Sequence, residues 1–305
     1  GGVLRYGIPS YRLPKDVLAK EIGVVAKLGA KFHFNKKVDE KGFQAIESKS
    51  DAVFVATGAY KNMPLGIPGD DLKGVISGTS FLEDVAMDKK TSLGKNVLIV
   101  GAGNVAVDAA RTAWRLGANV TIVYRRQEAD MPANKDEIRE AQREGIQFVF
   151  LAAPKAVLGD EKGHVKALQV ARMVPGEYDV SGRQKPVATG EVYDIACDTV
   201  MVAIGERVDS AFLKACDIAL NDNGTVKVDP VTFQTNRPKV YAGGDLVMGP
   251  ATAVEAMAQG KEAAQHIDRM LTGQDRFEKL YKKFTYENVV PENPTGVKHQ
   301  TGCHL

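Results

Sequence analysis

Cysteine is scarce in this sequence, and the three that occur, Cys197, Cys216 and Cys303, are far apart. They form no C-x-x-C pair, which argues against a redox dithiol, a zinc site or a disulfide framework within this stretch. We therefore expect no metal site here and a reducing, cytoplasmic location.

Long apolar runs and an excess of one charge are also lacking. No uninterrupted apolar stretch could span a bilayer, and no signal peptide is visible. Lysine and arginine number 40 against 38 aspartate and glutamate, so no basic field indicates nucleic acid or an anionic membrane as a partner. The 305 residues suffice for two domains with a sizeable core each. Because the sequence begins with Gly1 in an interior-looking segment, we expect a fragment.

What the sequence does contain is a strand, a glycine turn, a helix and a second strand between Asn96 and Arg126. The apolar run VLIV leads into GAGNVA, which has the G-x-G-x-x-A spacing of a dinucleotide-binding turn. Gly101 permits the tight turn, Gly103 admits a pyrophosphate, and Ala106 allows close packing of helix on strand. The alternative is a glycine turn in an ordinary α/β domain.

Two arginines, Arg125 and Arg126, end the second strand. An NAD site would carry an acidic residue there for the ribose 2′-hydroxyl, whereas a 2′-phosphate requires cationic donors. One good arginine contact would favour NADPH over NADH by roughly ten- to hundredfold. The alternative is that both arginines are solvated surface charge.

A second glycine motif occurs in YAGGDLVMGPATAVEAMAQGK. A strand ends at Gly-Gly-Asp, and a helix begins near Ala251 and Thr252 with only small residues in its first turn. Such a helix start admits a bulky ligand and favours electron density at its positive end. Asp245 has the chemistry to accept from sugar-like hydroxyls, although a plain aspartate loop before a packed helix is the alternative.

Further elements follow from periodicity and turn residues. We expect helices over 15–28, 77–87 and 134–144, and strands over 32–34, 51–56, 147–151, 199–204, 226–228 and 240–242. Antiparallel strands broken by turns near Gly159, Glu161 and Gly176 fill 155–194, with His164 on the surface. The strands that end at Thr57-Gly58 and at Gly205 indicate two related nucleotide-binding folds, although a plain turn explains Thr57-Gly58 equally well.

The segments GGVLRYGIPSYRLPK, GAGNVAVDAARTAWRLGANVTIVYRR and YAGGDLVMGPATAVEAMAQGK together resemble the glutamate synthase small-subunit family of flavoproteins. That family includes the large subunit of ferredoxin-dependent transhydrogenases and the N-terminal part of dihydropyrimidine dehydrogenase. The resemblance covers Gly1 to about Leu271 and does not distinguish between members.

The resemblance implies an α/β fold with two doubly wound, three-layer nucleotide-binding domains, the NADPH domain being inserted into the FAD domain. We expect residues 1–75 and 208–272 in the FAD domain, 76–207 in the NADPH domain, and 273–305 as a linker or tail.

The resemblance also implies the site residues. Contacts to FAD are expected from Gly1, Gly2, Arg12, Val38, Thr57, Gly58, Gly244, Asp245, Ala251 and Thr252. Contacts to NADPH are expected from Gly101, Ala102, Gly103, Asn104, Val105, Arg125, Arg126, Ala203, Ile204 and Gly205. No acid–base catalyst is expected, because hydride transfer depends chiefly on positioning the two rings.

The implied activity is that of an NADPH-dependent flavin oxidoreductase. Hydride would pass from NADPH to FAD, and electrons would leave through iron–sulfur clusters to a larger catalytic or ferredoxin-linked subunit. The family's first flavin βαβ unit and its cluster domain are expected upstream of Gly1, so we expect this chain alone to hold flavin weakly. The alternatives are a ferredoxin-linked NADP transhydrogenase subunit, a non-catalytic NADPH-binding or assembly module, and, disfavoured by the absent C-x-x-C, a thioredoxin-reductase-like enzyme.

Overall fold

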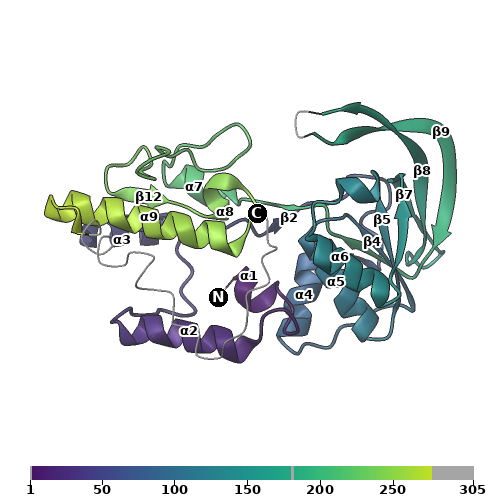
Figure 1. The fold of residues 1–305 in the computed structure, drawn as a ribbon, viewed down its shortest axis with the longest axis horizontal. Coiled ribbons are helices and arrows are strands. Elements are labelled where there is room, and N and C mark those ends of the chain that lie inside the picture. Colours follow the sequence, from purple (N-terminus) through teal and green to yellow (C-terminus); the bar gives the residue numbers. More distant parts are fainter. Residues whose placement is uncertain (1, 180–181, 277–305) are drawn as a thin grey trace, which may run out of the picture. The chain divides into compact units, whose positions relative to one another are not determined.

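The chain forms two compact units, and each unit is built from two separate segments. The first unit runs up to Lys37 and from Gly58 to Asp209, and the second contains Val38–Thr57 and the residues from Ser210 onward. A computed structural model describes residues 2–179 and 182–276 (Figure 1). The units divide at residues 57 and 209, and the segment before Val38 clusters with the dinucleotide fold. The predicted functional boundaries at 75, 207 and 272 stay predictions.

A five-stranded parallel sheet organises the first unit, in the order β3-β10-β4-β5-β6. Its strands are β3 (Val75–Ser77), β10 (Thr199–Val202), β4 (Asn96–Val100), β5 (Asn119–Tyr124) and β6 (Gln147–Phe150). Both faces of this sheet are buried, which explains why β4 is apolar at every position after its first.

The two faces are covered by different layers (Figure 1). Val97 and Ile99 join the core beneath the helices, whereas Leu98 and Val100 join the core beneath an antiparallel sheet. The helices are α4 (Gly78–Ala86), α5 (Asn104–Arg115) and α6 (Lys135–Arg143), and the second sheet contains β7 (Ala152–Gly159), β8 (Val165–Tyr178) and β9 (Gln184–Ala196). The unit therefore has three layers, as predicted, and one outer layer is a sheet.

The remaining elements of the first unit are short or peripheral. They are α1 (Val3–Tyr6), α2 (Lys15–Lys27), β2 (Lys61–Asn62), the 3-10 turn Glu128–Asp130 and β11 (Glu206–Arg207). Strands β2 and β11 pair antiparallel.

The second unit has a small parallel pair at its centre. Val53–Val55 (β1) lies beside Val240–Ala242 (β12) in register. Its helices are α3 (Glu40–Lys49), α7 (Ser210–Ala215), α8 (Asp245–Met248) and α9 (Ala253–Thr272). Phe43 of α3 meets Phe212 of α7 edge to face, with ring centroids 6.1 Å apart, and Arg237 pairs with Glu47.

Most predicted elements are confirmed, and three are wrong. Residues 32–34 form no strand, and no described strand pairs with them; Phe32 and Phe34 stack on each other at 5.9 Å instead. Val226 makes a single bridge to Leu220 rather than a strand over 226–228. Gly176 lies inside β8 and not in a turn.

Candidate nucleotide sites

The turn between β4 and α5 is fixed by Gly101. Its φ of 132° belongs to a region that favours glycine. A Cβ atom here would lie 2.1 Å from the carbonyl oxygen of Ala203. Gly101 is therefore required by the protein's own packing, as the motif predicts.

Gly103 differs, because the surrounding protein leaves its side-chain position empty. Its φ of −81° suits any residue, and a Cβ atom would meet nothing within 4 Å. Gly103 is also the N-cap of α5, and it offers no side-chain acceptor to that helix. The first N–H groups of α5 thus border an open space, an arrangement suited to a phosphate.

The turn after β10 lies beside this space. The Ala203 amide donates to Val100 at 2.9 Å, and a Cβ atom at Gly78 would lie 3.2 Å from the Ala203 Cβ. Ile204 is 43% exposed and Gly205 has a φ of 120°. The structure therefore brings the predicted residues Ala203, Ile204 and Gly205 to the Gly101–Val105 turn.

Ala102 and Asn104 connect the turn to the segment before α6. The Ala102 carbonyl accepts from the Ala133 amide at 3.2 Å, and the Asn104 side-chain oxygen accepts from the Asn134 amide at 2.9 Å. Val105 is partly buried and packs against the core beneath the helices. Asn104 is thus engaged by the protein itself.

The two predicted arginines have different environments at the end of β5. Arg125 is exposed. Arg126 is 9% exposed, and one of its terminal nitrogens contacts the Asp179 carboxylate at 2.8 Å. The solvated-charge alternative therefore does not describe Arg126.

In the second unit, the Gly-Gly-Asp segment follows β12 and approaches β1 closely. A Cβ atom at Gly243 would lie 2.8 Å from the Phe54 ring. Gly244 has a φ of 70°, and its amide donates to the Gln259 side-chain oxygen at 2.7 Å. Thr57 follows β1, so it shares the carboxyl edge of the parallel pair with Gly244.

Asp245 begins α8, and its carboxylate accepts weakly from the Ala251 amide at 3.3 Å. Burial raises the pKa of Asp245 above its usual range. Thr252 and Glu255 form a capping box at the start of α9. The amides of Thr252 and Glu255 are therefore already hydrogen-bonded at the helix start, where a ligand was predicted.

The other residues predicted to contact FAD belong to both units, with Gly2 and Gly58 in the first and Val38 in the second. Gly2 is the N-cap of α1 with a φ of 58°, Val38 is 38% exposed before α3, and Gly58 has a φ of 73°. Gly1 lies outside the described residues. Contacts of these residues to a flavin stay predictions.

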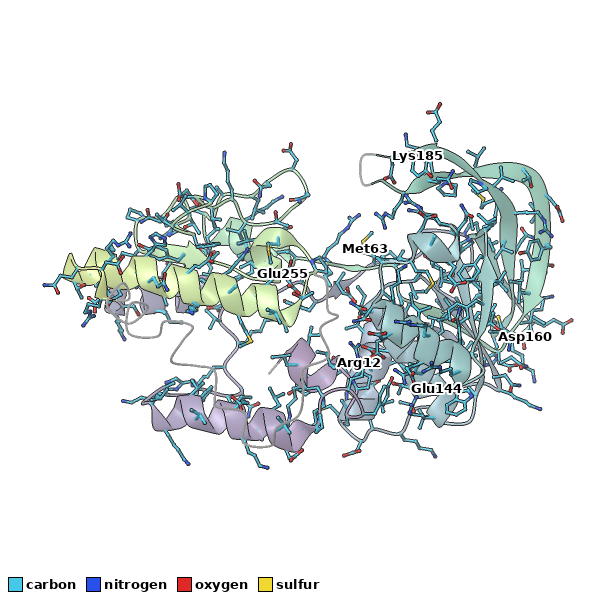
Figure 2. All side chains as sticks on the ribbon, viewed as in Figure 1. Arg12, Met63, Glu144, Asp160, Lys185 and Glu255 are labelled. Atoms are coloured by element: carbon cyan, nitrogen blue, oxygen red, sulfur yellow. The ribbon has the colours of Figure 1, made fainter. Side chains whose placement is uncertain are left out.

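Arg12 belongs to an ionic network that sequence reasoning missed. Its guanidinium contacts both oxygens of Asp108 at 2.7 and 2.8 Å and Glu137 at 3.2 Å. Arg111 pairs with Glu137 and Glu144. Figure 2 shows Arg12 and Glu144 on the side of the first unit formed by its helices. The pattern carried no signal, because the partners lie 96 residues apart in the sequence.

The described cysteines do not suit thiol chemistry. Cys197 and Cys216 are buried and free. Burial raises the pKa of the Cys197 thiol to about 12, and burial also raises the pKa of Cys216. Within residues 2–179 and 182–276, His, Cys, Asp and Glu form no cluster that could hold a metal ion. None of the described helices is long and apolar enough to cross a membrane.

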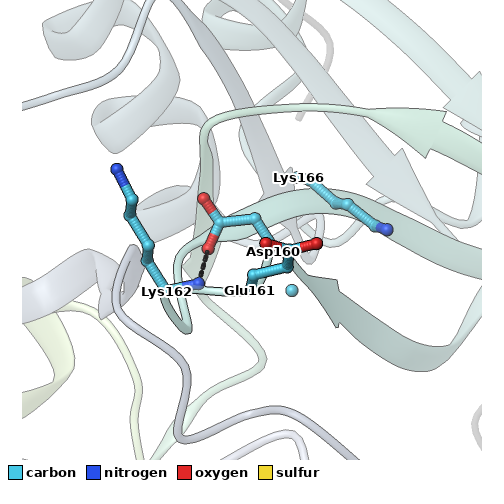
Figure 3. A pocket seen from close by; sticks show the side chains of 5 residues that line it. Asp160, Glu161, Lys162 and Lys166 are labelled. Atoms are coloured by element: carbon cyan, nitrogen blue, oxygen red, sulfur yellow. Dashed lines mark hydrogen bonds between the residues drawn. The ribbon is translucent and has the colours of Figure 1, made fainter.

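A shallow surface pocket at the turn between β7 and β8 was not predicted (Figure 3). It is lined by Gly159, Asp160, Glu161, Lys162 and Lys166. The Asp160 carboxylate accepts from the Lys162 amide at 2.9 Å, so it is occupied in holding the turn. The nearby His164 is exposed, as expected.

Several known proteins with similar sequences are NADP(H)-linked by name. The chain is 46% identical over 277 residues to the NADP(+)-dependent formate dehydrogenase subunit beta of Moorella thermoacetica, covering 89% of this chain and 39% of that protein. It is 38% identical over 281 residues to a putative glutamate synthase (NADPH) small chain of Cereibacter sphaeroides, covering 88% and 68%. It is 34% identical over 298 residues to the NADPH-Fe(3+) oxidoreductase subunit beta of Geobacter sulfurreducens, covering 89% and 44%. The chain thus spans less than half of two of these three relatives.

Solved structures share the fold at low identity. FprA from Mycobacterium tuberculosis in complex with NADPH has a TM-score of 0.71 and 19% identity, covering 92% of this chain and 76% of that one. The thioredoxin reductase of T. acidophilum has a TM-score of 0.65 and 22% identity, covering 88% and 86%. These likenesses confirm the predicted α/β nucleotide-binding class.

The family match agrees with the fold and with the two glycine motifs. Residues 15–260 match the family described as pyridine nucleotide-disulphide oxidoreductase, which is most of the chain. The predicted resemblance is confirmed, since glutamate synthase small chains are among the relatives. The chain belongs to the pyridine nucleotide-disulphide oxidoreductase family.

Proposed function

We propose that this chain is the NADPH-binding and flavin-binding portion of an oxidoreductase that exchanges electrons with a partner subunit. The observation that carries the proposal is the open space at Gly103. The protein's own packing does not require a glycine there, whereas a dinucleotide pyrophosphate at the start of α5 does. Arg125 is exposed at the end of β5, the position at which such folds contact the ribose 2′-phosphate.

The second unit has features that suit FAD. Gly244 and Asp245 lie at the carboxyl edge of a parallel strand pair, the usual position of a nucleotide in such folds. We propose that these residues, with Thr57, Ala251 and Thr252, hold the cofactor. When bound, FAD accepts a hydride from reduced nicotinamide and releases electrons one at a time.

The proposal of a partner subunit is supported by the names of the relatives. Three relatives are named as beta or small subunits of NADP(H)-linked enzymes. We propose a glutamate synthase small-subunit type of role, with a larger catalytic or iron–sulfur-containing partner. A ferredoxin-linked transhydrogenase subunit and a non-catalytic NADPH-binding module are the alternatives.

The test is an anaerobic titration with NADPH, at an FAD concentration high enough for the flavin to be bound to the chain. Bleaching of the flavin absorbance supports the oxidoreductase. A flavin that stays oxidised while NADPH is bound would favour the binding-module alternative and contradict the proposal.

A matched pair of glycine variants locates the nucleotide. Gly103→Ala should weaken NADPH binding by about tenfold or more, because a methyl group occupies the space of the pyrophosphate. Gly23→Ala is the control. Its Cβ atom likewise meets nothing within 4 Å, but Gly23 belongs to helix α2 and not to the dinucleotide turn. Equal affinity of both variants for NADPH would place the pyrophosphate elsewhere.

A further inference from the structure

The Arg126 side chain is buried without a complete set of partners. One terminal nitrogen donates to Asp179 at 2.8 Å, but the other, Nη1, is buried and has no hydrogen-bond partner. Leaving a charged donor buried and unpaired costs more free energy than leaving a neutral one unpaired. This donor at the end of β5 therefore has no hydrogen-bond partner among the described residues and is available to a bound anion.

The partner of Arg126 comes from the end of the β8–β9 hairpin. The Asp179 amide donates to the Arg183 carbonyl at 2.8 Å, and the Asp179 carboxylate accepts from the Arg183 amide at 3.2 Å. Gln184 at the start of β9 accepts from the Gln127 side chain at 2.8 Å. Lys185, labelled in Figure 2, marks this end of the hairpin. Two contacts therefore hold the hairpin end against the segment that follows β5.

Three arginines act electrostatically on the Tyr124 phenol at the end of β5. Although burial raises the pKa of the Tyr124 phenol, the charges of Arg126, Arg183 and Arg125 each act to lower it. Asp130 acts on the same phenol in the opposite direction. Three cations against Asp130 and Asp179 leave an excess of one positive charge, which favours an anion such as a phosphate.

We propose that Arg183, which contacts Asp179 through its backbone just before β9, is a third cationic contact for the 2′-phosphate. Asp179 positions Arg126 so that its Nη1 faces the phosphate. This inference rests on the proposed function, because it assumes that NADP(H) binds at the β4–α5 turn. It assigns nucleotide preference to a hairpin that follows the dinucleotide motif by more than 50 residues.

The first test compares NADP⁺ and NAD⁺ binding to the full chain by calorimetry. Arg183→Ala should weaken NADP⁺ by about tenfold and leave NAD⁺ within about twofold, because one charge-assisted contact is lost. The control is Arg172→Ala, which removes the same charge from β8 where Arg172 pairs with Glu191 at 2.8 Å. The control should retain the affinity of the unaltered chain for both nucleotides.

The outcomes separate the two proposals. If the unaltered chain does not prefer NADP⁺, the proposed NADPH specificity fails and the hairpin inference fails with it. If the unaltered chain prefers NADP⁺ and Arg183→Ala keeps that preference, only the hairpin inference is overturned. An equal loss for both nucleotides, together with a lower melting temperature, also overturns it, because Arg183 would then be structural.

A second variant tests the role of Asp179. Asp179→Asn keeps an oxygen acceptor for Arg126 but removes the charge that competes with a phosphate. We expect NADP⁺ to bind severalfold more tightly and NAD⁺ to bind unchanged. Unchanged affinity for both nucleotides would place Arg126 outside the phosphate site.

Discussion

Gly101 and Gly103 are glycines for different reasons, although only one residue separates them. Gly101→Ala should lower the free energy of unfolding by about 2 kcal/mol or more, because its Cβ atom would lie 2.1 Å from a backbone oxygen. Gly103→Ala should leave stability unchanged. Urea denaturation of the two variants measures the difference, and equal stabilities would show that the turn adapts to an alanine at position 101.

Glu144 contributes stability that is lost at acid pH. Burial alone would raise its pKa, but hydrogen bonds from Arg111 and Arg115 lower it to about 2. Because the folded-state pKa lies below the unfolded value, this stabilisation is fully present above about pH 4.5 and is lost as the pH falls toward 2. Glu144→Gln should cost about 2 kcal/mol at neutral pH and flatten stability across that window.

Melting temperatures between pH 2 and pH 7 check this prediction. The control is Glu140→Gln on the same helix, since Glu140 forms only an exposed pair with Arg143. If Glu144→Gln loses stability in acid as steeply as the unaltered chain, other carboxylates cause that loss.

The residue types at the dinucleotide turn were predictable, but their partners were not. G-x-G-x-x-A between a strand and a helix specifies the turn, because each small residue meets a local steric requirement of the turn, the ligand or the helix packing. The Arg126 contact to Asp179 spans 53 residues, and no periodicity encodes it. Arg12 contacts Asp108 in the structure, and its contact to a flavin stays a prediction.

At the scale of elements, the start of α9 depends on Thr252. Its hydroxyl accepts from the Glu255 amide, and Glu255 reaches back to the Thr252 amide. Thr252→Ala should lower the free energy of unfolding by about 1 kcal/mol. Thr252→Ser is the matched control because it keeps the hydroxyl. Equal losses in chemical denaturation would show that the methyl group, and not the cap, matters.

Long elements with strong periodicity were predictable from the sequence, and isolated short ones were not. Helix α5 and strand β5 follow directly from buried apolar spacing. Residues 32–34 have strand composition, but a strand also requires a neighbour. Gly176 suggested a turn, yet a Cβ there would lie 2.7 Å from Val187, so this glycine permits close approach of β9. Helix α3 was missed, although Asp39 caps it.

For the whole molecule, each nucleotide should stabilise one unit more than the other. NADP⁺ at 100 times its dissociation constant should add about 2.7 kcal/mol to the unit that binds it. Hydrogen exchange should therefore slow in residues 58–209 more than in 210–272. Equal protection of both segments on adding NADP⁺ would contradict the assignment of this nucleotide to the first unit.

The division into units was only partly predictable. The dinucleotide motif identifies a domain by itself, because its strands and helix are contiguous in sequence. Residues before Val38 cluster with that domain through contacts such as Arg12 with Asp108. Only three-dimensional packing reveals such a connection, and the assignment of this segment to the flavin domain stays a prediction.

The close contacts around Ala203 constrain how this sequence can drift over evolutionary time. At Gly101 the obstacle is a backbone oxygen, 2.1 Å from an added Cβ, so no exchange of the residue at 203 relieves it. At Gly78 the nearest atom is the Ala203 methyl group, at 3.2 Å. A library randomised at these three positions should therefore return only glycine at 101 after selection. At 78 and 203 it should return small residues that covary, so that a larger residue at one position accompanies a smaller one at the other.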